Sequence, residues 1–251
     1  MKGKFLTDTG RVRSHNEDAG GVFYNTAGQC LAVIADGMGG HRAGDVASRM
    51  ATSLLEEKWL KSGTFHEPEK TEEWLTQTVD EINHAIYTRS QEIEECHGMG
   101  TTIVITVFAE EFVTIAHIGD SRCYRIYEGN FQQITEDHSL VNALVQSGQI
   151  TKDEAQNHPR KNVVLKALGT EAEVSADIKT LSFESGSIFL LCTDGLTDKV
   201  MDEEIAEQFK SGSGLDEIGQ QLIDLSNDRG GEDNISLIFL QQDTPVKAGE
   251  G

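Results

Sequence analysis

The sequence predicts an α+β fold in which antiparallel β-sheets are covered by helices. Apolar runs of strand length recur along the chain, some are joined by connections too short for a crossover helix, and two long amphipathic segments stand apart from these runs. The runs are rich in Val, Ile, Thr, Phe and Tyr, which favour strands. In chain order, we expect strands at residues 30–36, 101–109, 112–120, 122–127, 131–135, 187–194 and 234–240.

The connections between these strands set their directions. Residues 109–111 join two of the predicted strands, and residues 128–130 join two others. Connections this short reverse the chain, so the strands that they join are antiparallel neighbours. We therefore expect a β-meander in the middle of the chain.

Two long helices are predicted between the first and the second of these strands. One starts at Asp45 and the other near Glu69, and in both of them apolar residues recur every three or four positions. These apolar faces are expected to pack on the core. Shorter helical patterns cover residues 139–147, 202–210 and 215–226.

Length and composition bound the domain organisation. The 251 residues fit one large domain over residues 1–242, followed by a polar tail over residues 243–251 that we expect to be disordered. The amino terminus lacks the apolar segment of a secretory signal, and no stretch of about 18 apolar residues occurs. We therefore expect a cytoplasmic protein without membrane insertion. We also expect a monomer, because no heptad pattern is present.

The charge of the chain argues against several classes of partner. The 42 acidic residues outnumber the 21 basic ones, which gives a formal net charge of −21. Such a field repels nucleic acid and anionic membrane surfaces, and it repels a phosphate-bearing ligand unless a cation lies between. The four cysteines form no CxxC pair, so they indicate neither a zinc site nor a disulfide framework.

Four aspartates stand at the ends of predicted strands. Asp36, Asp120 and Asp194 each close an apolar run and precede Gly or Ser, whereas Asp233 stands just before a run. In an antiparallel sheet the end of one strand lies beside the start of the next, so all four can share one sheet edge. Clustered carboxylates repel one another unless protons or cations intervene, and oxygen ligands suit Mg²⁺ or Mn²⁺. The alternative is four separate turn aspartates, since Asp and Gly are common in turns.

The glycines after Asp36 fit no nucleotide-binding motif. A dinucleotide fingerprint would need Gly at the position of Arg42, and no GK[ST] sequence is present. Gly37 instead lets the backbone approach closely, so that its carbonyl can join the Asp36 carboxylate at a metal ion.

An arginine near the amino terminus adds a group that matches phosphate. Arg13 lies close in sequence to Glu17 and Asp18. A guanidinium group binds phosphate in a fork-like arrangement, so beside a metal cluster Arg13 could hold a tetrahedral anion. Without the aspartates, this charged run would be typical of a solvated surface.

A series of motifs then suggests a family. The chain carries, in this order, the segments RVRSHNEDA, ADGMGGHRAGDVAS, GMGTT, AHIGDSRCY, TEDHSLV, HPRKNVVLKALG, CTDGL and GGEDNIS. This series resembles the PPM family of metal-dependent protein serine/threonine phosphatases, the type 2C phosphatases, over residues from about 5 to 240. The likeness is greatest to the stand-alone bacterial members, which oppose membrane-anchored kinases in Gram-positive bacteria. It implies a four-layer α/β/β/α sandwich with two central antiparallel β-sheets.

The resemblance implies roles for the acidic residues. Asp36 would bridge two metal ions, and the Gly37 carbonyl would bind one of them. Asp194 and Asp233 would hold the other ion. Asp120 together with Asp194 would hold a weaker third ion.

The resemblance also implies groups that act around the metals. Arg13 would bind the substrate phosphate, while Glu17 and Asp18 would orient metal-bound waters. Residues 146–169 would form a mobile flap beside the site.

The source of the leaving-group proton is a point of departure from some relatives. Those relatives carry a proton-donating His directly after the Asp-Gly pair, where this chain has Met38. His41 lies three residues further on and is a candidate proton donor. A metal-bound water is the alternative.

The implied activity is hydrolysis of phosphoserine and phosphothreonine in phosphorylated proteins, opposing a cognate serine/threonine kinase. A water or hydroxide bridging two Mg²⁺ or Mn²⁺ ions would attack phosphorus directly. None of the cysteines has Arg six positions later, as the phosphate loop of a cysteine-based phosphatase requires. Bound metal ions would also reverse the sign of the potential at the site, which accommodates the acidic charge.

Two other functions remain open from the sequence. A catalytically weak, phosphoprotein-binding regulatory module could share the fold, although the presence of all four aspartates and Arg13 argues against it. A two-metal nuclease fits the carboxylates but not the acidic surface, because it must contact many backbone phosphates.

Overall fold

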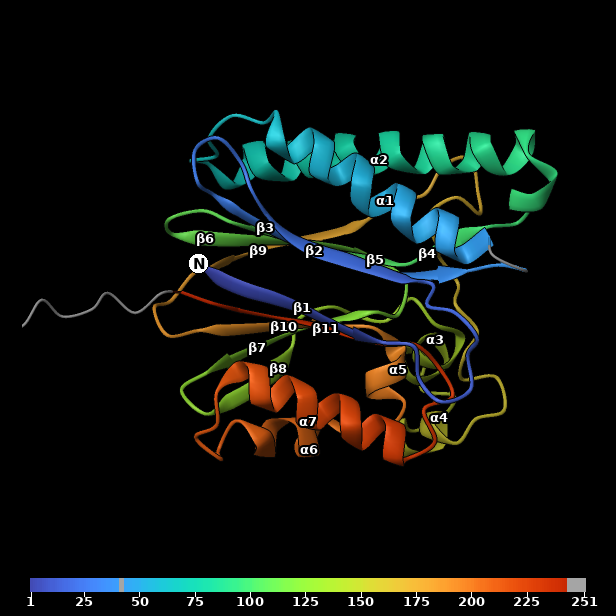
Figure 1. Cartoon of the computed structure of the whole chain (residues 1–251), viewed down its shortest axis with the longest axis vertical. Helices are drawn as coiled ribbons and strands as arrows, with labels where there is room; N and C mark the ends of the chain where they lie inside the picture. The colour runs from blue at the N-terminus through green and yellow to red at the C-terminus, as the bar shows by residue number, and fades with distance from the viewer. Residues whose placement is uncertain (41–42, 243–251) are drawn as a thin grey trace, which may run out of the picture.

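Two antiparallel β-sheets pack face to face, and helices cover the outer face of each sheet (Figure 1). The structure is a computed structural model that describes residues 1–40 and 43–242. The four layers confirm the predicted α+β sandwich. His41, Arg42 and the predicted tail at residues 243–251 lie outside the described residues.

The first sheet has the strand order β2-β3-β5-β6-β9, and β4 pairs with β3 beyond this path. All neighbouring strands in it are antiparallel. Its strands are β2 (Asp18–Tyr24), β3 (Cys30–Met38), β4 (Gly100–Thr101), β5 (Ile103–Phe108), β6 (Phe112–Ile118) and β9 (Asp177–Ser182).

The second sheet has the strand order β1-β11-β10-β7-β8 and is also antiparallel throughout. Its strands are β1 (Lys2–Asp8), β7 (Arg122–Tyr127), β8 (Asn130–Gln133), β10 (Ile188–Cys192) and β11 (Ile235–Gln241).

Two groups of helices complete the sandwich. The long helices α1 (Ala43–Leu60) and α2 (Pro68–Glu92) cover the first sheet, while α6 (Asp202–Gln208) and α7 (Leu215–Asp228) cover the second (Figure 1). Among the described helices, none is both long and apolar enough to cross a lipid bilayer. The remaining helical segments are short: the 3₁₀ turn η1 (Glu94–Cys96), α3 (Leu140–Gln146), α4 (Lys152–Gln156) and α5 (Asp194–Thr197).

The core forms three apolar layers, because the central strands are buried on both faces. Along β3, Leu31 packs under α1 and α2, while its neighbour Ala32 points between the sheets. Along β11, Ile238 points between the sheets and Leu237 packs against the helices of the other face. Burial of both faces explains why these strands are uninterrupted apolar runs in the sequence.

Each predicted strand is present, with its ends shifted by a few residues, but three further strands were not predicted. These are β1, β2 and β9, and each of them lies at the edge of a sheet. Exposed or partly exposed residues make up most of each edge strand. Their sequences therefore lack the long apolar run that marks a central strand.

The predicted β-meander is wrong. The hairpin β5–β6 belongs to the first sheet, whereas the hairpin β7–β8 belongs to the second. Between them the chain passes from one sheet to the other at residues 119–121. Each hairpin has the predicted antiparallel pairing. Short connections thus fixed the local pairing but not the sheet to which each hairpin belongs.

Candidate metal centre

The four predicted aspartates come from both sheets. Asp36 lies near the end of β3 and Asp120 follows β6, whereas Asp194 follows β10 and Asp233 precedes β11. The prediction of a single shared sheet edge is therefore corrected to two edges, one from each sheet, that meet where the sheets stack. Burial raises the pKa of Asp36 most, followed by the charge of Asp18. The other three aspartates are also close enough for their charges to raise this pKa. We call Asp18, Asp36, Asp120, Asp194 and Asp233 the acidic cluster.

A close backbone contact brings Asp194 beside Asp233. These residues lie at the paired ends of β10 and β11, where the Thr193 N–H donates to the Ser236 carbonyl at 3.1 Å. The next residue, Gly195, packs so closely that a Cβ atom there would lie 1.9 Å from the carbonyl oxygen of Asn234. The glycine after Asp194 is thus required by the approach of two backbones.

The backbone of Asp36 is held by two threonines of the GMGTT segment. The Asp36 N–H donates to the Thr102 hydroxyl at 3.0 Å, and the Thr102 N–H donates to the Asp36 carbonyl at 2.9 Å. The Thr101 hydroxyl donates to the same carbonyl at 2.9 Å. Sequence reasoning gave these threonines no role, although the motif that contains them was recognised.

Gly37 lies in a crowded part of the backbone. Its N–H donates to the Glu17 carbonyl at 3.1 Å. A Cβ atom at Gly37 would lie 2.1 Å from the carbonyl oxygen of Gly44 at the start of α1. The predicted close approach of the backbone at Gly37 is therefore present, and its partners are Glu17 and Gly44.

Asn234 ties the amino-terminal segment to the second sheet. Its side-chain oxygen accepts from the Glu17 N–H at 2.8 Å, and its amide group donates to the carbonyls of Thr9 and His15 at 2.9 and 3.1 Å. This residue was not predicted to act at the site. Its position directly after Asp233 was the only signal in the sequence.

Arg13 and the two acidic residues near it also reach the site. The Arg13 guanidinium lies 2.7 Å from Asp233 Oδ2 and 3.9 Å from Glu17 Oε2, with 46% of its side chain exposed. Asp18 pairs with Asp36 across β2 and β3, and its Oδ2 accepts from the Thr193 hydroxyl at 3.0 Å. The sequence-predicted residues of the described chain thus lie together.

Too few positively charged groups lie near the acidic cluster to neutralise its carboxylates. Surrounding protein, followed by neighbouring carboxylates, raises the pKa of Asp36 and of Asp194 well above their usual range. Burial raises the pKa of Asp18 to about 7, and burial together with the charge of Asp137 raises that of Asp120 to about 6. The buried atoms Asp18 Oδ1 and Asp194 Oδ1 have no hydrogen-bond partner.

This donor set fits divalent cations that prefer oxygen. Carboxylate oxygens and a backbone carbonyl are ligands for Mg²⁺ or Mn²⁺, whereas zinc sites usually include Cys or His. Asp36 and Asp194 remain partly accessible to solvent, so an ion can reach them. Among the described residues, no three carboxylates of the acidic cluster have ligand atoms that all lie within 4.8 Å of one another, so the cluster is more open than a compact site for one ion.

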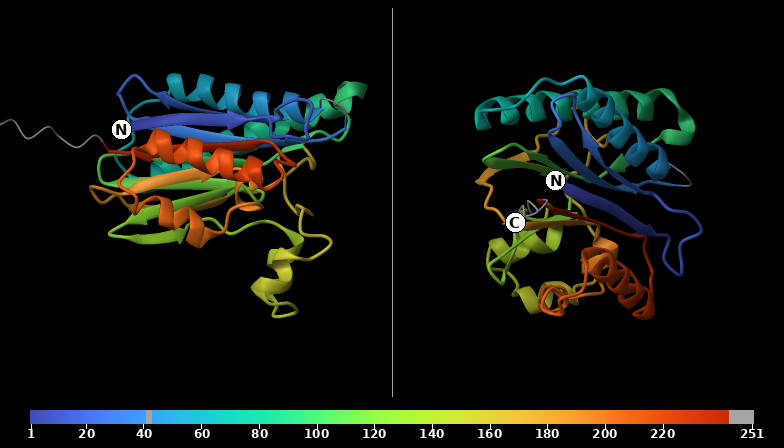
Figure 2. Two further views of the ribbon diagram at one scale, coloured as in Figure 1. Left: turned by 60° about the horizontal axis from the view of Figure 1, so that its bottom comes forward. Right: turned by 60° about the vertical axis from the view of Figure 1, so that its left-hand side comes forward.

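The segment predicted to be a flap, residues 146–169, extends from the body of the molecule around α4 (Figure 2). Its returning end is fixed, because Leu168 pairs with Thr101 through two backbone hydrogen bonds of 3.0 and 2.9 Å. The Gly169 N–H also donates to the side chain of Asn83 at 2.7 Å. Thr101 therefore connects the Asp36 carbonyl with this segment.

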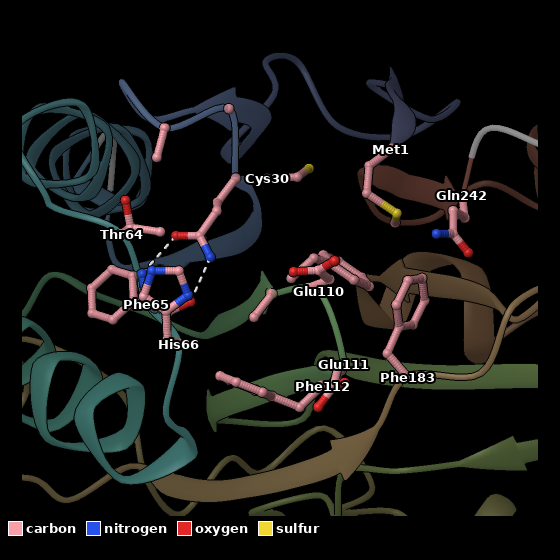
Figure 3. Close-up of a pocket in the computed structure, with 15 residues that line it drawn as sticks. Met1, Cys30, Thr64, Phe65, His66, Glu110, Glu111, Phe112, Phe183 and Gln242 are labelled. Carbon is pink, nitrogen blue, oxygen red and sulfur yellow. Dashed lines mark hydrogen bonds between the residues drawn. The ribbon is translucent and has the colours of Figure 1, made fainter. Parts of the chain in front are cut away.

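A pocket of about 510 Å³ lies at the other end of the sandwich. Phe65, Phe112 and Phe183 line it together with Met1 (Figure 3). It opens near Cys30, where β3 begins, whereas Asp36 lies near the end of the same strand. This pocket is therefore separate from the acidic cluster.

Comparisons with known proteins give one consistent result. The family model described as Protein phosphatase 2C matches residues 9–237. The chain is 45% identical over 247 residues to the serine/threonine phosphatase stp of Listeria monocytogenes, covering 98% of each chain. It is 37% identical over 240 residues to the protein phosphatase PhpP of Streptococcus pneumoniae, covering 96% of this chain and 97% of that protein.

Solved structures agree with these sequence matches. The serine/threonine phosphatase Stp1 from Staphylococcus aureus is similar with a TM-score of 0.91 and 42% identity, covering 97% of this chain and 95% of that one. The catalytic domain of the serine threonine protein phosphatase PstP, in complex with two manganese ions, gives a TM-score of 0.82 at 34% identity and covers 95% of this chain and 96% of that one. The chain belongs to the protein phosphatase 2C family.

Proposed function

We propose that this chain is a metal-dependent protein serine/threonine phosphatase that hydrolyses phosphoserine and phosphothreonine. The observation that carries the proposal is a cluster of under-neutralised carboxylates from both sheets, beside an arginine with a partly exposed side chain. The relatives named as serine/threonine phosphatases and the manganese-bound PstP structure support it.

The residues divide into those that hold metal and those that hold substrate. Asp36 would contact two ions, the Gly37 carbonyl one of them, and Asp194 with Asp233 the other. Asp120 with Asp194 would hold a third ion. When bound, the ions would activate water for attack on phosphorus and neutralise phosphate charge.

The protein groups around the ions position the substrate and solvent. Arg13 would bind the phosphoryl oxygens in a fork, while Glu17 and Asp18 would orient water by accepting hydrogen bonds. His41 remains a candidate proton donor, with a water of the site as the alternative. Residues 146–169 would act as a flap.

Activity of the chain is expected to depend on a divalent metal ion. The purified chain should release phosphate from a phosphothreonine peptide when Mn²⁺ or Mg²⁺ is added, and EDTA should abolish the release, because the aspartates alone offer no electrophile. Measurement of free phosphate with and without EDTA tests this. Tight phosphopeptide binding without turnover would instead favour the regulatory-module alternative, which the full set of aspartates disfavours.

Arg13 is expected to contribute mainly to substrate binding. Arg13→Ala should lower kcat/KM for the phosphopeptide about tenfold to a hundredfold, mainly through a higher KM, because a charge-assisted hydrogen bond to phosphate contributes about 1.5–3 kcal/mol. Steady-state kinetics with saturating Mn²⁺ would measure this. Arg11→Ala is the matched control, since Arg11 is exposed and its backbone N–H donates to the Gly231 carbonyl at 2.7 Å rather than to a residue of the acidic cluster. An unchanged KM in Arg13→Ala would contradict the proposal that Arg13 binds the substrate phosphate.

Phosphorylated proteins would be the substrates of this enzyme, and a cognate serine/threonine kinase would oppose it. We expect the chain to act in the cytoplasm as a monomer, with residues 1–242 forming one phosphatase domain.

A further inference from the structure

A second group of metal-binding side chains lies apart from the acidic cluster. It consists of His117 in β6, His138 in the segment after β8, and Asp177 at the start of β9. Within the described residues, they form a group in which the candidate ligand atoms all lie within 4.8 Å of one another. His117 and Asp177 are paired across neighbouring strands, and the His138 ring stacks on that of His117 with centroids 4.7 Å apart.

Hydrogen bonds determine which ring nitrogens are available. His117 Nε2 lies 2.8 Å from the Glu136 carbonyl oxygen, which can only accept, so Nε2 carries the proton and Nδ1 keeps its lone pair. His138 Nδ1 accepts from the Gly119 N–H at 3.2 Å, so the proton of the neutral ring lies on Nε2. That nitrogen is buried and makes no hydrogen bond, although Asp177 Oδ2 lies 3.3 Å away.

We propose that His117, His138 and Asp177 bind a zinc ion. Two imidazoles and one carboxylate form a donor set that suits Zn²⁺, whereas the all-oxygen acidic cluster suits Mg²⁺ or Mn²⁺. The bond from His117 Nε2–H to a backbone carbonyl is the outer contact that orients zinc-binding histidines in proteins. A water would complete four-coordination.

The site needs a small closure to bind zinc. Ligands around 2.0–2.1 Å from a tetrahedral ion lie about 3.4 Å apart. Asp177 Oδ2 and His138 Nε2 are already 3.3 Å apart, so the closure needed is that between His117 and these two groups. Asp177 is free to follow such a closure, because its side chain is 54% exposed and its ion pair with Lys166 at 3.4 Å is also solvent-exposed. An exposed pair of this kind contributes little stability and is readily displaced.

Zinc binding would change the proton position on His138. With the ion at Nε2, the neutral ring carries its proton on Nδ1, where it faces the Gly119 N–H and breaks the present hydrogen bond. Gly119 immediately precedes Asp120, and the His138 carbonyl accepts from the Leu165 N–H at 2.7 Å. The zinc site is thus linked to the acidic cluster and to residues 146–169.

Zinc binding is tested by equilibrium dialysis of the full chain against Zn²⁺ in excess Mg²⁺. The wild type should bind one more Zn²⁺ per chain than Asp177→Asn at low Zn²⁺, with an affinity at this site at least about tenfold higher. Asp216→Asn is the control, since Asp216 is likewise exposed and paired with a lysine, Lys4, at 3.0 Å. Both variants should keep wild-type Mn²⁺-dependent activity in the absence of zinc.

Long-range ¹H–¹⁵N spectra of the histidine rings give the second readout. Added Zn²⁺ should shift Nδ1 of His117 and move the His138 ring proton from Nε2 to Nδ1, while the exposed His84 ring stays unchanged. Equal zinc binding by wild type and Asp177→Asn, or unaltered His117 and His138 rings in the zinc-bound protein, would overturn the proposal.

Discussion

Asp36→Asn is expected to lower kcat at least about a thousandfold and, at the same time, to stabilise the metal-free protein. The proposed site places Asp36 between two ions, and an amide is a poor ligand for both of them. Loss of that bridge removes about 4 kcal/mol or more of transition-state stabilisation, which corresponds to the expected fall in kcat. Phosphate release at saturating Mn²⁺ measures this effect.

The gain in stability follows from the pKa of Asp36. Burial and the neighbouring carboxylates raise this pKa well above its ordinary value of 3.8 in the metal-free fold. The stability that protonated Asp36 gives is present below pH 3.8 and is lost as the pH rises through the folded-state pKa. Asn cannot ionise, so the unfolding temperature of the metal-free variant should fall less than that of the wild type above about pH 4.

Mn²⁺ should reverse the order of stability. Because the ion binds the folded wild type, it should raise the unfolding temperature of the wild type and have little effect on Asp36→Asn. Asp216→Asn removes an exposed carboxylate and should match the wild type in activity and in its response to Mn²⁺. A variant of Asp36 with activity within tenfold of the wild type would refute the bridging role.

The central strands were predictable because of where they lie. β3 and β5 are buried on both faces, so nearly every position is apolar and the strands stand out in the sequence. The edge strands β1 and β9 bury only part of their surface. Their exposed polar residues interrupt the apolar run by which a strand is recognised in a sequence. The passage from β6 to β7 was also hidden, because a short connection looks the same whether the chain stays in one sheet or changes sheets.

The residue types of the site were predictable, but its construction was not. Carboxylates at strand ends predicted a cluster, and the family resemblance supplied the partner sheet that the pattern alone did not reveal. The contacts that hold Asp36 come from Thr101 and Thr102, whose hydroxyls carry no charge signal in a sequence. The role of Asn234 could not be predicted for the same reason, because its side chain is uncharged and its contact with Glu17 depends on the fold.

Gly195→Ala is expected to lower Mn²⁺-dependent activity at least about a hundredfold, although Gly195 is not one of the proposed metal ligands. A Cβ atom at this position would lie 1.9 Å from the Asn234 carbonyl oxygen, so the two backbones must move apart by more than an ångström. The residues before them, Asp194 and Asp233, are proposed to share one ion. A misplacement of about 1 Å can cost about a hundredfold in rate, and steric overlap costs about 1–3 kcal/mol of stability.

Titration of activity with Mn²⁺ separates this effect from simple unfolding. If the aspartates have moved apart, the half-saturating Mn²⁺ concentration should rise at least about tenfold, and high Mn²⁺ should restore part of kcat, because the ion pulls its ligands together. Unlike Asp36→Asn, this variant should also lower the unfolding temperature of the metal-free protein. Gly63→Ala is the control, since a Cβ atom at Gly63 would meet nothing within 4 Å. A less stable Gly195→Ala protein with an unchanged Mn²⁺ requirement would mean that the close contact supports the fold alone, and that the spacing of Asp194 and Asp233 is set elsewhere.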